Sequence, residues 1–175
     1  MTGDIDLFVH DAEEMRNLVK SLPVLAEAGG IKVGLLRDVG HLVRARLSEP
    51  NGGSVEIDIV HETSIDLSDP PPPIEGVVVE SLTDLRASKL TCILSRSEPR
   101  DLVDLLFLDR AGYPPEKDLG IAAQKDAGID PGVLAWLLGQ FPTSPLPEML
   151  EPLSSEELEE FRVALAERLR RLSVP

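Results

Sequence analysis

The stretch Gly3-Asp4-Ile5-Asp6-Leu7-Phe8-Val9 places two acidic residues two positions apart, with apolar residues between and after them. Successive side chains of a β-strand point to opposite faces, so Asp4 and Asp6 would share one face and Ile5 and Leu7 the other. Two neighbouring carboxylates repel each other, and a divalent cation between them would offset that repulsion. The stretch therefore predicts a strand with a polar face that is a candidate cation site.

A second stretch, Ser54-Val55-Glu56-Ile57-Asp58-Ile59-Val60, repeats the pattern. If the two strands pair in one sheet, three or four carboxylates converge, and hard oxygen ligands of this kind suit Mg²⁺ or Mn²⁺. Asp4, Asp6 and Asp58 are the leading set, with Glu56 as a substitute for the third position. The same alternation also describes any half-buried strand with a solvated face, and this interpretation stays open.

The surrounding pattern predicts a small mixed sheet. Residues 4–9, 31–37, 41–47 and 54–60 are expected strands, and residues 12–28 an expected helix with Asp11 as its N-cap and Gly29-Gly30 at its end. Turns are expected at residues 38–40 and 50–53, the second containing Asn-Gly. The fold class is therefore α/β (α+β).

A proline run at residues 70–73 separates this part from a helical second half. We expect a brief strand at residues 74–80 and then helices that begin near Ser81, near Ser97, at residue 116, at Asp130-Pro131 and at a Ser-x-x-Glu capping box from Ser154. The predicted domains are a sheet core, residues 1–80, and a helical lobe, residues 81–175.

The composition is that of an ordinary globular protein, with 42% hydrophobic and 27% charged residues. The formal net charge of −14 argues against broad, non-specific affinity for nucleic acid but leaves room for a local basic patch. A single cysteine, Cys92, fits a reducing compartment, and no apolar run approaches the length of a membrane span. We therefore expect a cytoplasmic protein with no membrane association.

The sequence lacks the motifs of several other classes of enzyme and binding site. The sequence contains no Walker loop and no Gly-x-Gly-x-x-Gly, and His10 and His61 lack the spacing of a zinc site. A phosphohydrolase using the same acids is weakly supported, because no nucleophile accompanies them.

In the helical half, Lys89 could contact phosphate oxygens, although an exposed helix lysine is the simpler interpretation. Arg100, Asp101 and Asp104 have helical spacing that gathers them along one edge, where they could also form a surface ion pair of little energetic weight.

Taken in order, four segments resemble the AbiEii-type nucleotidyltransferases, the toxin-like members of type IV toxin–antitoxin systems within the DNA polymerase β-like superfamily. The segments are Gly3-Asp4-Ile5-Asp6-Leu7-Phe8, Val55-Glu56-Ile57-Asp58-Ile59-Val60, Ser81-Leu82-x-Asp84-Leu85-x-Ala87-x-Lys89-Leu90 and Ser95-Arg96-x-Glu98-x-Arg100-Asp101-x-x-Asp104-Leu105. The later Gln124-Lys125-Asp126 and Asp130-Pro131 are also similar, so the resemblance covers about residues 1 to 140.

The resemblance implies transfer of a nucleoside monophosphate from an NTP to an acceptor such as RNA, with Mg²⁺ or Mn²⁺ as the cofactor. Asp4, Asp6 and Asp58 would be the catalytic metal ligands, and Lys89 would contact the nucleotide phosphates. Arg100, Asp101 and Asp104 would shape the nucleotide pocket. A cognate antitoxin protein would be the expected partner.

One feature of the family is absent. Its members place a Gly-Ser pair about ten residues before their Asp-x-Asp, whereas this sequence has three residues before Asp4. Either the gene start lies upstream, or part of the nucleotide site has been lost. The second case predicts a catalytically degenerate domain that acts as a nucleotide-binding or protein-interaction module.

Overall fold

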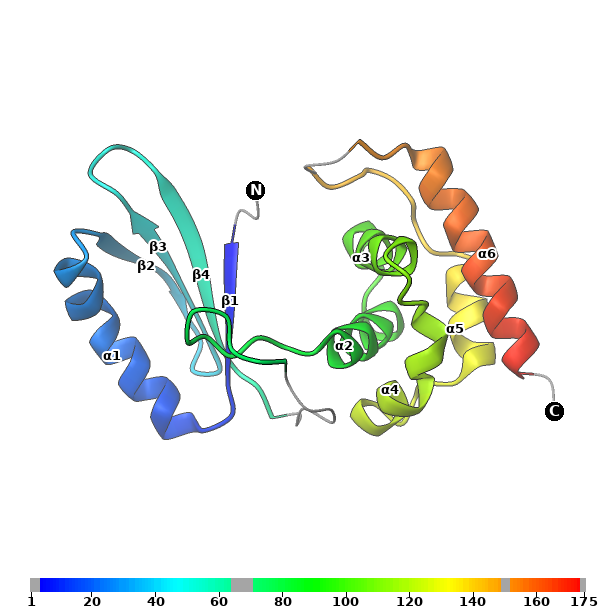
Figure 1. Ribbon diagram of the computed structural model, residues 1–175, viewed down its shortest axis with the longest axis horizontal. Helices are drawn as coiled ribbons and strands as arrows, with labels where there is room; N and C mark the ends of the chain where they lie inside the picture. The colour runs from blue at the N-terminus through cyan, green and yellow to red at the C-terminus, as the bar shows by residue number, and fades with distance from the viewer. Residues whose placement is uncertain (1–3, 64–70, 149–151, 174–175) are drawn as a thin grey trace. The chain divides into compact units, whose positions relative to one another are not determined.

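The computed structural model describes residues 4–63, 71–148 and 152–173 (Figure 1). It is a mixed α/β protein that divides into two compact units, Met1–Ile65 and Asp66–Pro175. The first contains the sheet and one helix, and the second contains the remaining helices. This division falls after residue 65. The sequence predicted a domain boundary after residue 80, and that boundary stays a prediction. The proline run was expected at that boundary, and its first proline, residue 70, lies outside the described residues.

The first unit begins with β1 (Asp4–Val9) and α1 (Ala12–Ala28), which have the bounds that the sequence predicted. Asp11 caps α1, because its carboxylate accepts hydrogen bonds from the backbone N–H groups of Glu13 and Glu14. The chain continues through β2 (Lys32–Asp38), β3 (Leu42–Ser48) and β4 (Ser54–His61). Gly40 and Gly52 adopt positive φ angles in the two predicted turns, which glycine does at no steric cost.

The four strands form one sheet in the order β1-β4-β3-β2. β1 pairs parallel with β4, and β4-β3 and β3-β2 pair antiparallel. Because α1 joins the two edge strands, it crosses one face of the sheet, as Figure 1 shows.

The core of this unit lies between α1 and the sheet. Its buried residues come from alternate positions of the strands and from one residue of α1: Val9, Met15, Val43, Ala45, Ile57 and Ile59. The even-numbered residues of β1, β3 and β4 therefore project from the face away from α1. Leu25 has the spacing of the apolar face of α1, but its side chain is 60% exposed, whereas that of Ala26 is buried.

The second unit is helical. It contains α2 (Leu82–Ser95), α3 (Pro99–Arg110), the 3₁₀ helix η1 (Pro115–Asp118), α4 (Leu119–Lys125), α5 (Pro131–Leu138) and α6 (Ser155–Ser173). The capping box of α6 is complete, because Ser154 and Glu157 exchange hydrogen bonds between their side chains and backbone N–H groups.

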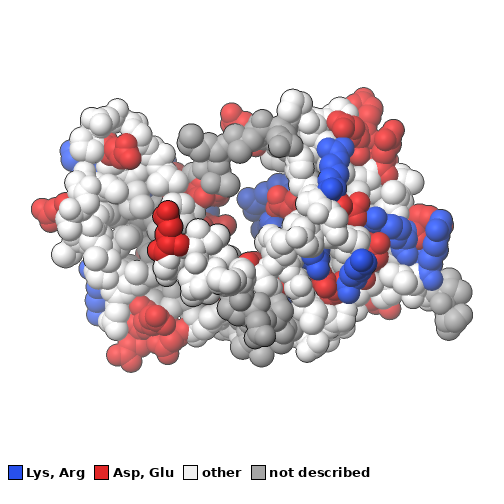
Figure 2. Space-filling view, viewed as in Figure 1, with Lys and Arg blue, Asp and Glu red and all other residues white. Residues whose placement is uncertain are grey.

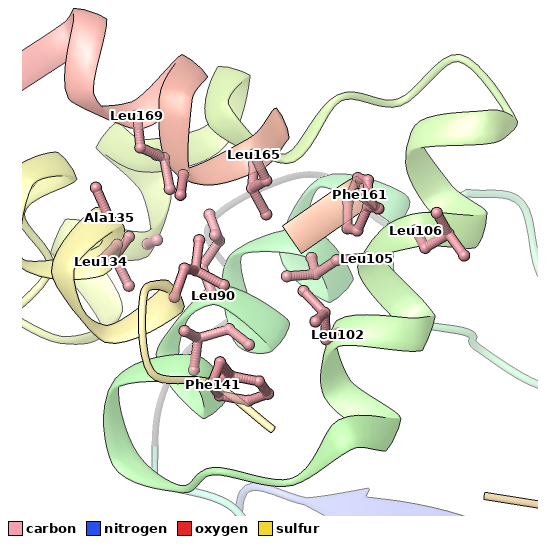
Figure 3. Close-up of a cluster of buried hydrophobic side chains, with 14 of the residues drawn as sticks. Leu90, Leu102, Leu105, Leu106, Leu134, Ala135, Phe141, Phe161, Leu165 and Leu169 are labelled. Atoms are coloured by element: carbon pink, nitrogen blue, oxygen red, sulfur yellow. The ribbon is translucent and has the colours of Figure 1, made fainter. Parts of the chain in front are cut away.

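Leucine and phenylalanine residues from α2, α3, α5 and α6 and from the segment after α5 meet in one core (Figure 3). Leu90, Leu102, Leu105, Leu134, Leu165 and Leu169 are all buried to within 1% of complete. Leu172 has the spacing of the same apolar stripe of α6, but its side chain is 54% exposed. The core fixes α2 and α3, the two helices that carry the predicted nucleotide-binding residues.

Three further local predictions need correction. The strand expected over residues 74–80 is not formed, because Glu75 and Gly76 take positive φ angles in a tight turn between the bridged residues Ile74 and Val77. The N-cap of α3 is Glu98 rather than Ser97. The helix expected from residue 116 is a 3₁₀ turn followed by α4.

Candidate functional site

The acidic residues of β1 and β4 lie in register on the sheet face away from α1. Asp4 is the register partner of Glu56, and Asp6 is the register partner of Asp58. The parallel pairing brings the acids of the two strands into adjacent rows on one face, as the alternation of the sequence predicted. The structure thus gathers Asp4, Asp6 and Asp58 on one rigid surface.

The next strand adds arginines to the same rows. Arg46 of β3 lies opposite Glu56, and Arg44 lies opposite Asp58. Arg46 Nη2 lies 2.6 Å from Glu56 Oε1. Arg37 of β2 in turn lies opposite Arg44. The row of Asp58 therefore contains two carboxylates and two guanidinium groups, whereas the row of Glu56 contains two carboxylates and one.

The contact between Arg44 and Asp58 is bidentate. Arg44 Nε donates to Asp58 Oδ1 at 2.6 Å, and Arg44 Nη2 donates to Asp58 Oδ2 at 2.5 Å. These charge-assisted bonds lower the pKa of Asp58, because they favour the ionised carboxylate. They also raise the pKa of Arg44, and the negative charges of Glu56 and Asp4 add to that effect.

The donor atoms of this face fit a hard divalent cation, because such a cation prefers carboxylate oxygens as ligands. Asp6 and Asp58 lie side by side and offer four of them. Within residues 4–63, 71–148 and 152–173, however, no three acidic, histidine or cysteine side chains are arranged to hold an ion. Both oxygens of Asp58 accept hydrogen bonds from Arg44. A cation that used all three predicted ligands would have to share or replace that arginine.

Sequence reasoning missed Arg44 and Arg46, although a signal was present. Strands joined by a hairpin around Asn51-Gly52 pair residues at equal distances from the turn, which sets Arg46 opposite Glu56 and Arg44 opposite Asp58. The turn residues and the alternating arginines together therefore indicated that these arginines lie opposite the acids of β4.

The second unit has a charged cluster of its own, formed by α2 and the first turns of α3. Asp101 is fully buried and accepts two hydrogen bonds from Arg96, from Nε to Oδ2 and from Nη2 to Oδ1, each at 2.8 Å. Lys89 Nζ lies 3.6 Å from Asp101 Oδ1 and forms a closer ion pair with Asp104. The structure thus brings together Asp101 and Asp104, two of the three residues whose helical spacing predicted this, and adds Lys89 and Arg96 from α2 and its C-terminal end.

Lys89 is held in its charged form. Burial disfavours the ammonium group, but the hydrogen bond from Lys89 to Asp104 and the charges of Asp104 and Asp101 outweigh burial, and the pKa of Lys89 is raised. A lysine fixed in this way is a permanent cation that could exchange a carboxylate for a phosphate.

Arg100 lies apart from this cluster. Its guanidinium group pairs with Glu98 at 2.7 Å, and the side chains of both residues are about half exposed. Arg96, which the sequence analysis did not single out as a site residue, makes the buried contact instead. Its proximity to Asp101 follows from the turn between α2 and α3 rather than from spacing within one helix.

An open hollow of about 400 Å³ adjoins Lys89. Leu85, Phe107 and Leu108 form its apolar wall, and Lys89 and Asp104 form its polar rim. An apolar wall beside a fixed cation suits a flat, partly apolar ligand that carries negative charge. Elsewhere on the visible surface of this unit, acidic and basic side chains are interspersed (Figure 2), and pairs such as Arg110–Glu157 account for part of that pattern.

Comparison with known families decides the classification. The sequence model for the nucleotidyl transferase AbiEii toxins of type IV toxin–antitoxin systems matches residues 1–173. The chain belongs to the AbiEii nucleotidyltransferase toxin family. The shared segments include the two acidic strands and the region of α2 and α3 described above.

Among solved structures, the AbiEii family chain is similar to MenT4, a nucleotidyltransferase toxin from Mycobacterium tuberculosis H37Rv. The two share 16% sequence identity with a TM-score of 0.47, and the match covers 98% of this chain and 72% of that chain. No curated protein matches this chain.

Membership supports nucleotidyltransferase function, and nucleotidyltransferases generally use divalent metal ions. In the part of the chain that the structure describes, none of the helices is long and apolar enough to cross a membrane.

Proposed function

We propose that this AbiEii family protein transfers a nucleoside monophosphate from an NTP to an acceptor, with RNA as the first candidate. The observation that carries the proposal is the register of β1 and β4, which places Asp4, Asp6 and Asp58 on one sheet face in a chain of this family. As in other enzymes of this chemistry, a carboxylate face is suited to a metal-bound triphosphate.

Asp4, Asp6 and Asp58 are the proposed ligands of Mg²⁺ or Mn²⁺. When bound, the ion would supply charge neutralisation at the triphosphate and at the attacking oxygen. Asp58 is also the proposed acceptor of the proton of the attacking hydroxyl, a role that the family resemblance suggests for the third carboxylate.

Residues of the second unit are proposed to bind the nucleotide. Lys89 would exchange its ion pair with Asp104 for the phosphates, while buried Asp101 keeps the ammonium group in place. The family resemblance assigns Arg100 to the nucleotide pocket as well, and the hollow beside Lys89 is a candidate position for the base.

The test is calorimetric titration of each NTP into the full chain, with and without Mg²⁺. Asp6→Ala should abolish the Mg²⁺-dependent part of binding. Glu27→Gln is the matched control, because Glu27 is an exposed acid of α1, on the other face of the sheet. Unaltered NTP binding by Asp6→Ala would refute the carboxylate site.

An RNA-labelling assay with radiolabelled NTPs then tests the transfer itself. A labelled RNA that appears with the wild-type protein and not with Asp6→Ala or Lys89→Met supports the proposal. Pull-down of a purified candidate antitoxin would test the partner that the family description implies. The proposed location is the cytoplasm, where NTPs are available.

One observation favours a second candidate, a catalytically degenerate module that binds nucleotides or a protein. Arg44 engages both oxygens of the third carboxylate, Asp58. Mg²⁺-dependent NTP binding without labelling of any acceptor would favour this function over transfer.

A further inference from the structure

Arg44 stands out among the residues of the carboxylate face because it engages a proposed metal ligand directly. Its bidentate contact involves both Oδ1 and Oδ2 of Asp58, at 2.6 and 2.5 Å. A divalent cation binds a carboxylate oxygen at about 2.1 Å. A guanidinium group and a dication at one carboxylate repel each other strongly, so Arg44 opposes metal binding at Asp58.

The two partners differ in their freedom to move. The side chain of Asp58 is 11% exposed and short, whereas that of Arg44 is 45% exposed and long. A long side chain that is half in solvent can leave its partner at a modest entropic gain, while Asp58 stays on the strand. Arg44 is therefore the member of the pair that can swing away.

Departure of Arg44 requires another anion in its place. Arginine binds phosphate oxygens with the same two-pronged geometry that it uses for carboxylates. The incoming cation would then offset the charges of Asp6 and Asp58, and the phosphates would bind the arginine.

We propose that Arg44 is a positioning residue that keeps Asp58 closed to metal until a nucleotide arrives, and that it then exchanges this carboxylate for phosphate oxygens. Metal and nucleotide would consequently bind cooperatively. This inference rests on the proposed function, because it assumes the carboxylate metal site.

Arg46 provides a matched control on the same strand. It is an arginine of similar exposure, 51%, and it pairs with Glu56 in the neighbouring row. Replacing Arg46 removes the same charge from the same face but leaves Asp58 bound to Arg44. A difference between the two variants therefore reports the contact with Asp58 and not the general electrostatic field.

The first experiment titrates Mn²⁺ into the full chain without nucleotide and follows free Mn²⁺ by electron paramagnetic resonance. Arg44→Met should bind Mn²⁺ about tenfold more tightly than the wild-type protein, since a charge-assisted hydrogen bond to Asp58 no longer competes. Arg46→Met should change the affinity by less than about threefold. Equal affinities of the two variants would overturn the proposal.

The second experiment measures binding of a non-hydrolysable NTP analogue in saturating Mg²⁺. Arg44→Met should weaken this binding, and Arg46→Met should leave it near the wild-type value. Arg44→Lys, which keeps the charge but not the bidentate geometry, should lie between wild type and Arg44→Met in both experiments, and it serves if the methionine variant fails to fold. An Arg44→Met protein that binds the analogue as tightly as wild type would contradict the exchange.

Asp6→Asn separates this inference from the proposed function. If Asp6→Asn loses Mn²⁺ binding while Arg44→Met and Arg46→Met behave alike, the gating role of Arg44 is wrong and the metal site stands. If Asp6→Asn binds Mn²⁺ like the wild-type protein, the carboxylate site fails, and the role of Arg44 fails with it.

Discussion

Replacing Arg96 by methionine tests whether the charged cluster of α2 and α3 is a buried, coupled structure. Arg96 donates two hydrogen bonds of 2.8 Å to Asp101, whose side chain is fully buried. Methionine keeps most of the apolar stem of arginine but removes both donors. The variant therefore leaves Asp101 with Lys89, 3.6 Å away, as its remaining cation in the cluster.

The size of the effect follows from burial. Removing one partner of a buried ion pair costs about 3–5 kcal/mol, because the other charge stays in a poorly solvated site. Asp101 lies in the first turn of α3, where the helix dipole stabilises a carboxylate by about 0.3–1 kcal/mol. Together with Lys89, this places the expected loss near the lower limit, at about 3 kcal/mol of unfolding free energy.

The assay is urea unfolding followed by far-UV circular dichroism, which reports the helical unit. With an m-value of about 2 kcal/mol/M, a loss of 3 kcal/mol lowers the midpoint by about 1.5 M. Arg100→Met is the matched control: the ion pair of Arg100 with Glu98 is half exposed and should contribute less than about 1 kcal/mol. The double variant Arg96→Met/Asp101→Asn has no buried carboxylate at position 101 and should recover part of the loss. If Arg96→Met shifts the midpoint no more than Arg100→Met, the cluster is not the coupled structure described here.

Three further predictions concern the second unit. Leu165→Ala should lower the free energy of unfolding by about 3 kcal/mol, because Leu165 is fully buried, whereas Leu172→Ala should cost less than about 0.5 kcal/mol; similar urea midpoints would contradict this difference. The backbone N–H of Ser154 and the side chain of Arg110 lower the pKa of Glu157, so its carboxylate stabilises α6 above the ordinary glutamate pKa, and this stabilisation is lost as the pH falls through the lowered pKa. The melting temperature of the wild-type protein should therefore fall more steeply between about pH 6 and pH 3 than that of Glu157→Gln, and parallel curves would refute this. Asp130→Ala should cost about 1 kcal/mol in thermal unfolding, because the Asp130 side chain accepts hydrogen bonds from the N–H groups of Gly132 and Val133; Asp130→Asn should keep most of that stability, and equal losses would exclude a capping role.

Local sequence signals predicted most elements of the fold. The bounds of β1 and α1 agree with the prediction, because strand alternation and the Asp11 cap are short-range features. The predictions that failed depend on neighbours distant in the sequence. Leu172 has the spacing of a core residue, yet its side chain is 54% exposed. Residues 74–80 have the composition of a strand, but Glu75-Gly76 reverse the chain and pair Ile74 with Val77.

The candidate site divides in the same way. The sequence by itself determined that Asp4 and Asp6 share a strand face, that Glu56 and Asp58 do the same, and that Asp101 and Asp104 lie along one edge of a helix. These relations follow from the periods of two and 3.6 residues, which need no tertiary contact.

The tertiary structure decided which ion pairs those acids form, although the turn at Asn51-Gly52 already indicated the register of β3 and β4. The pairing of β3 with β4 sets Arg44 against Asp58, and the turn between α2 and α3 sets Arg96, and not Arg100, against Asp101. An ion pair depends on distances of about 3 Å between side chains from different elements, and such distances are fixed only when strands take their register and helices pack.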